Sequence, residues 1–314
     1  MSKRVTPKAS KTPGAAVSKS SGRWWSRSVL VAGALGAAVV PAGLFATSAG
    51  AVVSIPAGYW AAASNGGVFQ SGSAASYGTA LGVSTPAVVG IASTIDGKGY
   101  TEVAADGGVF AYGDAAFYGS LGNVKLVSPI VGIAATSTGK GYYLVAADGG
   151  VFAFGDAVFH GSLGGQAIAA PISGIALSST GKGYYLVGQD GGVYAFGDAT
   201  FAGSYYTTYG TGSLSPIVGI SSSPTAGYVL LSQSGAVYAF GGGRFYSSPL
   251  LIGATGTAAA VQYTPDGLGY WVLQSDGGVY AFGDATGLAT AVTYAIGGAS
   301  NFSTSPAVAF APQL

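Results

Sequence analysis

The chain has 314 residues, of which 49% are hydrophobic, only 7% are charged and none is cysteine. The missing cysteines exclude disulfides and thiolate zinc sites, and a single histidine argues against a histidine-based metal site. The 55 glycines interrupt the chain too often for long helices and favour short strands joined by tight turns.

Residues 1–51 have the three parts of a secretory signal peptide. A stretch with seven basic and no acidic residues comes first, an apolar run at 29–46 follows, and Ala49-Gly50-Ala51 supplies an A-x-A cleavage site. We therefore expect cleavage after Ala51 and a secreted, extracellular or cell-surface protein. The alternative is an uncleaved anchor, because the apolar run approaches the ~20 residues that span a bilayer. Only through this segment would the chain meet a membrane.

The remaining residues, 52–314, carry five basic and eleven acidic side chains. The near-neutral charge of the whole chain therefore averages a basic leader with an acidic domain. A nucleic-acid-binding protein presents a basic stripe, and this domain has none. Nucleic acid is accordingly excluded as an expected partner.

A Gly-Tyr pair recurs six times in residues 52–314, each time opening a similar segment. Its tyrosines are Tyr59, Tyr100, Tyr142, Tyr184, Tyr228 and Tyr270, separated by 41, 42, 42, 44 and 42 residues. A period of about 40–45 residues is typical of β-propellers and solenoid arrays. The repeat therefore predicts an all-β architecture of six units.

The third copy illustrates the predicted unit. Asp148-Gly149 in its middle is a strong hairpin signal, because such turns need positive φ values. The strands that we expect around this and two further turns, named a to d in chain order, cover 129–134, 142–147, 151–154 and 158–162. Four short antiparallel strands match one propeller blade.

Strand c indicates how the blades stack. Phe152 and Phe154 point to one side of the strand, whereas Val151 and Ala153 point to the other. Both faces are apolar, so we expect both to be buried, with the rings of one blade filling the shallow face of its neighbour.

The two ends of the domain predict closure of the ring. The first copy begins at Gly58-Tyr59 without a strand a, and the segment 305–310 aligns with strand a at 128–133. We expect a single six-bladed propeller over 52–314, in which the C-terminal strand at 305–311 completes the N-terminal blade. An open solenoid would need polar caps at both ends, and none is evident.

The repeat GYYLVAADGGVFAFGDAxFxGS resembles one found in secreted proteins of high-GC Gram-positive bacteria, either alone or joined to cell-wall hydrolases and other exported enzymes. The resemblance covers nearly all of 52–314 and implies an extracellular, propeller-like module. It brings no catalytic residues with it. Copies one and five depart from the pattern, with Asn65 and Ser234 at the position of the first turn's aspartate.

The aspartates of the turns form two expected rings, one on each rim. Carboxylate rings invite a calcium interpretation, but Asp-Gly and Gly-Asp are also ordinary turn chemistry, and one carboxylate per blade does not converge on an ion. We therefore favour turn chemistry and expect no cofactor. The aspartates are Asp106, Asp148, Asp190 and Asp276 on one rim, and Asp114, Asp156, Asp198 and Asp284 on the other.

Two single residues also qualify as candidates. Glu102, the only glutamate, stands in register with Leu144 and Leu186 on a strand face expected to be apolar. Burial would raise its pKa, and perturbed acids cluster at functional sites. A glycosidase needs a second carboxyl group within about 5–10 Å, and the sequence names none, so we favour a tolerated substitution at the rim or channel. His160 shares its position with Tyr118, Ala202 and Tyr246, which predicts an exposed outer site.

The connections between blades vary most, and variable loops on a rigid frame often carry recognition. Exposed aromatic residues beside small hydroxyl residues suit stacking on sugar rings, a protein interface, or packing of the loops themselves. Two connections combine these residue types, 204–215 and 286–305. Their aromatic residues, our candidate ligand-binding set, are Tyr205, Tyr206, Tyr209, Tyr294 and Phe302.

These observations favour a non-catalytic module that binds a glycan, a cell-wall polymer or a protein partner. One alternative is a cell-wall-active hydrolase or lyase that uses Glu102 with a rim aspartate. A surface-layer or assembly protein is another alternative, indicated by low charge and abundant Ser, Thr, Gly and Ala.

Overall fold

The structure is a computed structural model that describes residues 58–83, 86–209, 215–225, 227–285 and 305–313. The expected leader, 1–51, lies outside these residues. The described chain is all-β apart from one short helix, α1 (Tyr205–Tyr209). Among the described residues, no helix has the length and apolar character needed to span a membrane.

The described strands form six three-stranded antiparallel sheets, which we call blades and number in chain order. Blade 1 contains β18 (Ala307–Pro312), β1 (Gly58–Ala63) and β2 (Val68–Gly72); blade 2 contains β3 (Val88–Ser93), β4 (Gly99–Ala104) and β5 (Val109–Gly113); blade 3 contains β6 (Ile130–Ala135), β7 (Gly141–Ala146) and β8 (Val151–Gly155). Blade 4 contains β9 (Ile172–Leu177), β10 (Gly183–Gly188) and β11 (Val193–Gly197); blade 5 contains β12 (Ile217–Ser222), β13 (Tyr228–Ser232) and β14 (Val237–Phe240); blade 6 contains β15 (Ala258–Tyr263), β16 (Gly269–Gln274) and β17 (Val279–Gly283).

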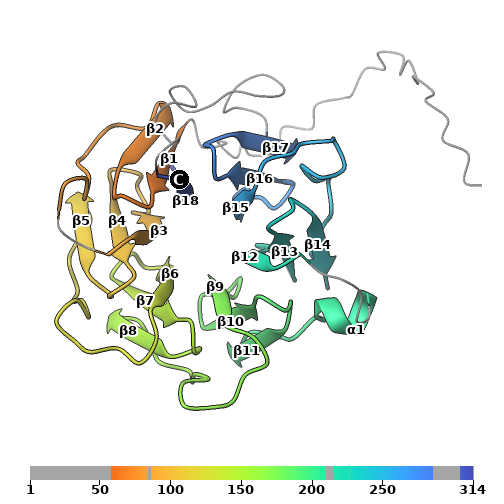
Figure 1. The fold of residues 1–314 in the computed structure, drawn as a ribbon, viewed down its shortest axis with the longest axis horizontal. Helices are drawn as coiled ribbons and strands as arrows, with labels where there is room; N and C mark the ends of the chain where they lie inside the picture. The colour runs from red at the N-terminus through yellow and green to blue at the C-terminus, as the bar shows by residue number, and fades with distance from the viewer. Residues whose placement is uncertain (1–57, 84–85, 210–214, 226, 286–304, 314) are drawn as a thin grey trace, which may run out of the picture. The chain divides into compact units, whose positions relative to one another are not determined.

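The blades lie around a common centre, as in a β-propeller, with strand a of each blade innermost (Figure 1). Strand β18 pairs antiparallel with β1, from Tyr59 opposite Pro312 to Ala63 opposite Ala307. The C-terminal strand therefore completes the N-terminal blade, as the sequence predicts. Blade 1 also packs on blade 6, because Phe310 and Tyr59 share a buried cluster with Trp271.

The blades stack through their faces in the predicted way. Phe152 and Phe154 of blade 3 pack in one cluster with Val103 of blade 2, whereas Val151 and Ala153 pack with blade 4. Four similar clusters join the other neighbouring blades of the described chain. The core is thus a ring of interfaces between blades, and strand b of blades 3 and 4 is buried along its whole length.

The expectation of a fourth strand in each blade is wrong. Segment 158–162 and its equivalents are irregular and make no ladder with strand c. The segment crosses instead to the next blade, where Tyr184 receives the N–H of His160 at 3.2 Å and donates to the carbonyl of Gly161 at 2.6 Å. Its backbone groups are therefore satisfied by a neighbouring side chain and not by a strand partner.

The same tyrosine contact recurs around the ring. The first tyrosine of strand b donates its hydroxyl to a backbone carbonyl of the preceding connection. The pairs are Tyr100 with Gly78, Tyr142 with Gly119, Tyr184 with Gly161, Tyr228 with Gly203, and Tyr270 with Ser247. The Gly-Tyr repeat of the sequence thus marks a contact that ties each described connection to the following blade.

Strand c ends at a glycine for a steric reason. Gly155 closes β8 with φ +67°, a backbone conformation that disfavours any residue with a Cβ. A Cβ there would also lie 2.2 Å from the carbonyl oxygen of Lys140. The Gly-Asp pair of the repeat therefore begins the turn that releases the chain from the sheet.

Candidate functional site

The candidate aromatic residues of connection 204–215 lie on and around α1, at the outer side of the ring between blades 4 and 5 (Figure 1). Ser204 caps the helix: its Oγ accepts the N–H of Thr207 at 3.4 Å, and the Thr207 hydroxyl accepts the N–H of Ser204 at 2.8 Å. The N–H of Tyr205 donates to the Gly191 carbonyl at 3.1 Å. This bond anchors α1 to the β10–β11 turn.

The rings of α1 form one cluster with strand c of blade 5. Tyr205 is buried and stacks on Tyr209 with ring centroids 5.4 Å apart, and its edge meets Tyr238 at 5.0 Å. Tyr209 also packs on Tyr238 at 5.2 Å. Tyr206 and Tyr209 remain 46% and 50% exposed. Tyr205 is therefore the anchor of the cluster, and the other two rings of α1 face solvent.

The two remaining candidates, Tyr294 and Phe302, lie outside the described residues. Reasoning from the sequence did not include Tyr238 and Phe240, which form the base of the α1 cluster. Their alternation in strand c assigned them to blade stacking. Burial raises the pKa of the Tyr238 phenol, which therefore stays neutral at physiological pH.

The aspartates of the b–c turns serve those turns. In four repeats an Oδ1 accepts the N–H of the glycine two residues later, at 2.8 to 3.0 Å. Asn65 makes the same contact with Gly67 at 3.0 Å, which explains how copy one does without the aspartate. Within the described part of the chain, no three His, Asp or Glu side chains gather as ligands for a metal ion.

On the opposite rim the aspartates join two turns of one blade. Asp156 accepts the Thr136 hydroxyl at 2.9 Å and also accepts the Thr138 hydroxyl, so the a–b turn is fixed to the end of strand c. These hydroxyl donors hold the pKa of Asp156 below its usual value. We call this side of the ring the turn rim.

Glu102 lies neither at a rim nor in the channel, which corrects the interpretation favoured from the sequence. It is fully buried in β4, and its Oε2 accepts the N–H of Ala80 at 3.0 Å. Its Oε1 has no hydrogen-bond partner among the described residues. Burial raises its pKa to about 7, and the Ala80 N–H opposes this shift only in part. No neighbouring carboxylate contributes to the shift, so the geometry offers no second acid for a glycosidase pair.

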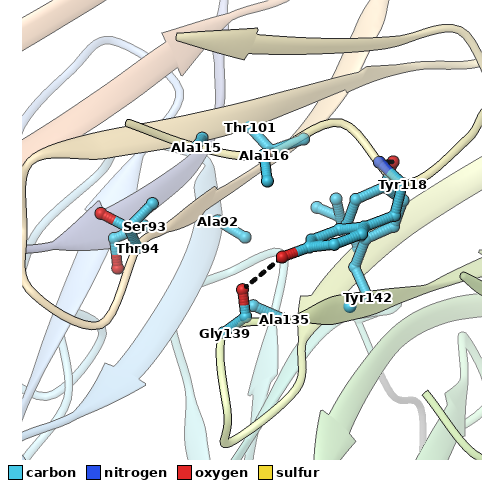
Figure 2. Close-up of a pocket in the computed structure, with 12 residues that line it drawn as sticks. Ala92, Ser93, Thr94, Thr101, Ala115, Ala116, Tyr118, Ala135, Gly139 and Tyr142 are labelled. Carbon is cyan, nitrogen blue, oxygen red and sulfur yellow. Dashed lines mark hydrogen bonds between the residues drawn. The ribbon is translucent and has the colours of Figure 1, made fainter. Parts of the chain in front are cut away.

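His160 is half-buried, so the expectation of an exposed outer site is wrong. Its ring packs on Tyr184 of the next blade with centroids 5.8 Å apart. Tyr118 occupies the equivalent place one repeat earlier, where it packs on Tyr142 at 5.8 Å. Figure 2 shows this arrangement, with the Tyr118 hydroxyl donating to the Gly139 carbonyl at 3.2 Å. The position therefore fills a slot between neighbouring blades.

The innermost strands surround a central cavity of about 420 Å³ that opens at the turn rim. Isoleucines of successive strands, such as Ile91, Ile133 and Ile175, line it together with alanines and hydroxyl side chains. None of the described residues that line it is charged. This lining supplies no acid or base for proton transfer.

No family model and no curated protein matches the sequence. Among solved structures, a chain from the crystal structure of a nidogen/laminin complex is similar to this one, with a TM-score of 0.55 and 11% sequence identity. The alignment covers 82% of this chain and 98% of that chain. At this identity the similarity concerns the fold alone, and it agrees with a β-propeller-like architecture.

Proposed function

We propose that this protein is a non-catalytic, extracellular binding propeller that binds a glycan or cell-wall polymer through the tyrosine platform of α1, formed by Tyr206 and Tyr209, which both pack on the buried Tyr205. The observation that carries the proposal is that two tyrosine rings stay half-exposed while a buried aromatic base fixes their positions. A rigid ring that is apolar on its face and polar at its tip suits the apolar faces and hydroxyls of a sugar chain.

Two further observations support a binding role. The exposed Thr208 beside the platform provides a hydroxyl group for hydrogen bonds with a ligand, whereas the Thr207 hydroxyl is held in the helix cap by Ser204. Glu102, the acid on which the enzyme alternative rests, is sealed between blades 1 and 2 and has no carboxylate partner. A sealed acid cannot touch a polymer outside the domain.

The proposal is tested with purified full-length protein against insoluble cell walls and a panel of soluble wall polysaccharides. We expect binding that weakens at least tenfold in the double variant Tyr206→Ala/Tyr209→Ala, with little change in melting temperature because both rings are exposed. The matched control is Phe117→Ala, which removes a ring that is 61% exposed in another repeat. Absence of glycan binding, or equal loss in the control, would refute the proposal.

A belt of phenylalanines favours a second candidate function, binding of a protein partner or self-assembly. At one repeat position, four phenylalanine side chains are between 48% and 61% exposed. Burial in the core therefore does not explain why phenylalanine recurs at this position. The four are Phe117, Phe159, Phe201 and Phe245. The similar solved chain comes from a complex of nidogen with laminin, which is a precedent for partner binding on this fold. Sedimentation over a range of concentrations tests self-assembly, and replacing all four rings by serine would abolish any association that they cause.

A further inference from the structure

The slot between neighbouring blades on the turn rim is closed in most of the described ring. One residue of each connection enters it and packs on the first tyrosine of the next strand b. The ring pairs are Tyr77 with Tyr100 at 6.0 Å, Tyr118 with Tyr142 at 5.8 Å, His160 with Tyr184 at 5.8 Å, and Tyr246 with Tyr270 at 5.6 Å. Tyr118 and Tyr246 also donate their hydroxyls to a carbonyl of the a–b turn, at 3.2 and 2.9 Å. These two tyrosines therefore act as plugs.

The slot between blades 4 and 5 has no such plug. The equivalent position there is Ala202, whose side chain is a single methyl group. Two other differences widen the same place. The a–b turn of blade 5 is closed by a bond from Ser223 N to Gly227 O, one residue tighter than the bond from Thr136 N to Gly141 O in blade 3. Gly242 also stands at the position of the aspartate that follows strand c in most other repeats.

The result is a pocket of about 230 Å³, against about 30 Å³ for the plugged slot between blades 2 and 3 (Figure 2). This volume is smaller than that of a typical drug-sized site, which limits the ligand to one small unit. Three differences at separate sequence positions meet in the lining of one cavity and set this interface apart from the plugged slot between blades 2 and 3.

The pocket is lined by oxygen atoms from both blades. On the blade 4 wall, the Asp198 carboxylate accepts Ser178 Oγ at 2.7 Å and also accepts the Thr180 hydroxyl. On the blade 5 wall, Ser223 Oγ and Thr225 Oγ1 lie 3.0 Å apart. The hydroxyl donors hold the pKa of Asp198 low, so its carboxylate is ionised and accepts further hydrogen bonds.

This lining selects a class of ligand. No basic side chain lines the pocket, and its one charged group is the Asp198 carboxylate, which repels an anion. A calcium ion takes six to eight oxygen ligands, and the pocket has one carboxylate. A sugar matches better, because its neighbouring hydroxyls donate to a carboxylate and accept from serine and threonine. We propose that the pocket between blades 4 and 5 binds one neutral sugar unit, with Asp198 as acceptor and the Ser223–Thr225 hydroxyl pair as donor.

The experiment replaces Ala202 by tyrosine, the residue that fills the slot at Tyr118 and Tyr246. D-glucose, D-galactose, D-arabinose and N-acetylglucosamine are tested against full-length protein by saturation-transfer NMR and titration. We expect at least one sugar to bind, and the variant Ala202→Tyr to lose tenfold or more in affinity while keeping or raising the melting temperature. The matched control His160→Tyr plugs the preceding slot and should bind that sugar like the parent.

A second variant, Gly242→Asp, restores the turn aspartate of the other repeats and should also weaken binding, because its carboxylate would take the Ser223 and Thr225 hydroxyls. The inference is overturned if none of the four sugars binds, or if Ala202→Tyr and Gly242→Asp both bind as the parent does. It does not depend on the proposed function. The double tyrosine variant of α1 should leave sugar binding in the pocket intact, so either proposal can fail alone.

Discussion

The hydroxyl of Tyr184 in β10 donates to the carbonyl of Gly161, a residue of the preceding repeat, at 2.6 Å, and accepts the N–H of His160 at 3.2 Å. One side chain thereby satisfies a donor and an acceptor of a segment that has no strand partner. The ring of Tyr184 is itself fully buried. The contact joins two repeats that are also linked by apolar packing and by a backbone hydrogen bond from the Ile172 N–H to the Ala147 carbonyl at 2.9 Å.

Replacing this tyrosine by phenylalanine isolates the contribution of its hydroxyl. We expect Tyr184→Phe to lower the free energy of unfolding by about 1–3 kcal/mol, because two partly buried backbone groups lose their partner. Urea unfolding measures the effect. The control Tyr206→Phe alters a half-exposed ring on α1 and should stay within about 0.5 kcal/mol of the parent. Equal stability of Tyr184→Phe and the parent would contradict this role.

The pairing of β18 with β1 should decide whether the domain folds cooperatively. Deleting residues 305–314 removes the inner strand of blade 1 and the Phe310 contact with blade 6, so we expect no cooperative thermal transition. The milder variant Phe310→Ala should cost about 3–5 kcal/mol, as expected for a buried aromatic ring. Phe245→Ala, at a half-exposed ring, is the control. An unchanged melting temperature after the deletion would count against a closed ring.

Glu102 should make the domain more stable in acid than in weak base. Its pKa is raised from 4.5 to about 7 in the folded protein, so the folded state holds a proton that the unfolded state releases. Its contribution is therefore complete below the unfolded pKa and is lost as pH rises to about 7. Between pH 5 and pH 8 the loss comes to roughly 2–3 kcal/mol.

The variant Glu102→Gln keeps an oxygen for the Ala80 N–H but cannot ionise, so this part of the pH dependence should vanish. Chemical unfolding of both proteins at the two pH values makes the comparison. Parallel stability profiles for the two proteins would show that Glu102 does not carry a raised pKa.

Gly155 offers a test of the turn that ends strand c. Gly155→Ala combines a left-handed backbone with a Cβ placed 2.2 Å from the Lys140 carbonyl oxygen, so we expect a loss of roughly 2 kcal/mol or more. Gly165→Ala is the matched control, since Gly165 has φ +79° and open space around its Cβ. It should cost only the backbone strain, about 1–2 kcal/mol. Equal losses in the two variants would mean that the turn relaxes away from the clash.

The repeat made much of the fold predictable. The spacing of Gly-Tyr pairs identified six units, the alternation in 151–154 identified the two stacking faces, and the segment 305–310 identified the closing strand. The predicted strands of the third copy agree with β6, β7 and β8 to within one residue at each end. The fourth strand was wrong because apolar residues in a short segment do not reveal whether they pair with their own sheet or contact the next one.

The candidate site was predictable only in part. Exposed aromatics in connection 204–215 were expected, but the helical form of Tyr205–Tyr209 and its base on Tyr238 depend on contacts between blades. The pocket at Ala202 could not be predicted from the sequence either. The sequence shows Tyr, His and Ala at one repeat position, but it does not show that this position faces a neighbouring blade. From the sequence Glu102 was interpreted as a tolerated substitution at the rim or channel, which was wrong, because it is buried between blades 1 and 2 with a raised pKa.

The antiparallel pairing of Tyr59 with Pro312 also determines when the ring can close during synthesis of the chain. The ribosome makes β1 early, but its inner partner emerges only about 250 residues later, at a sequence separation that slows folding. Until β18 has been made, strand β1 lacks its inner partner, and blade 6 lacks its contact with Phe310. The ring can therefore close only after β18 has been synthesised, because β18 is the inner strand of blade 1.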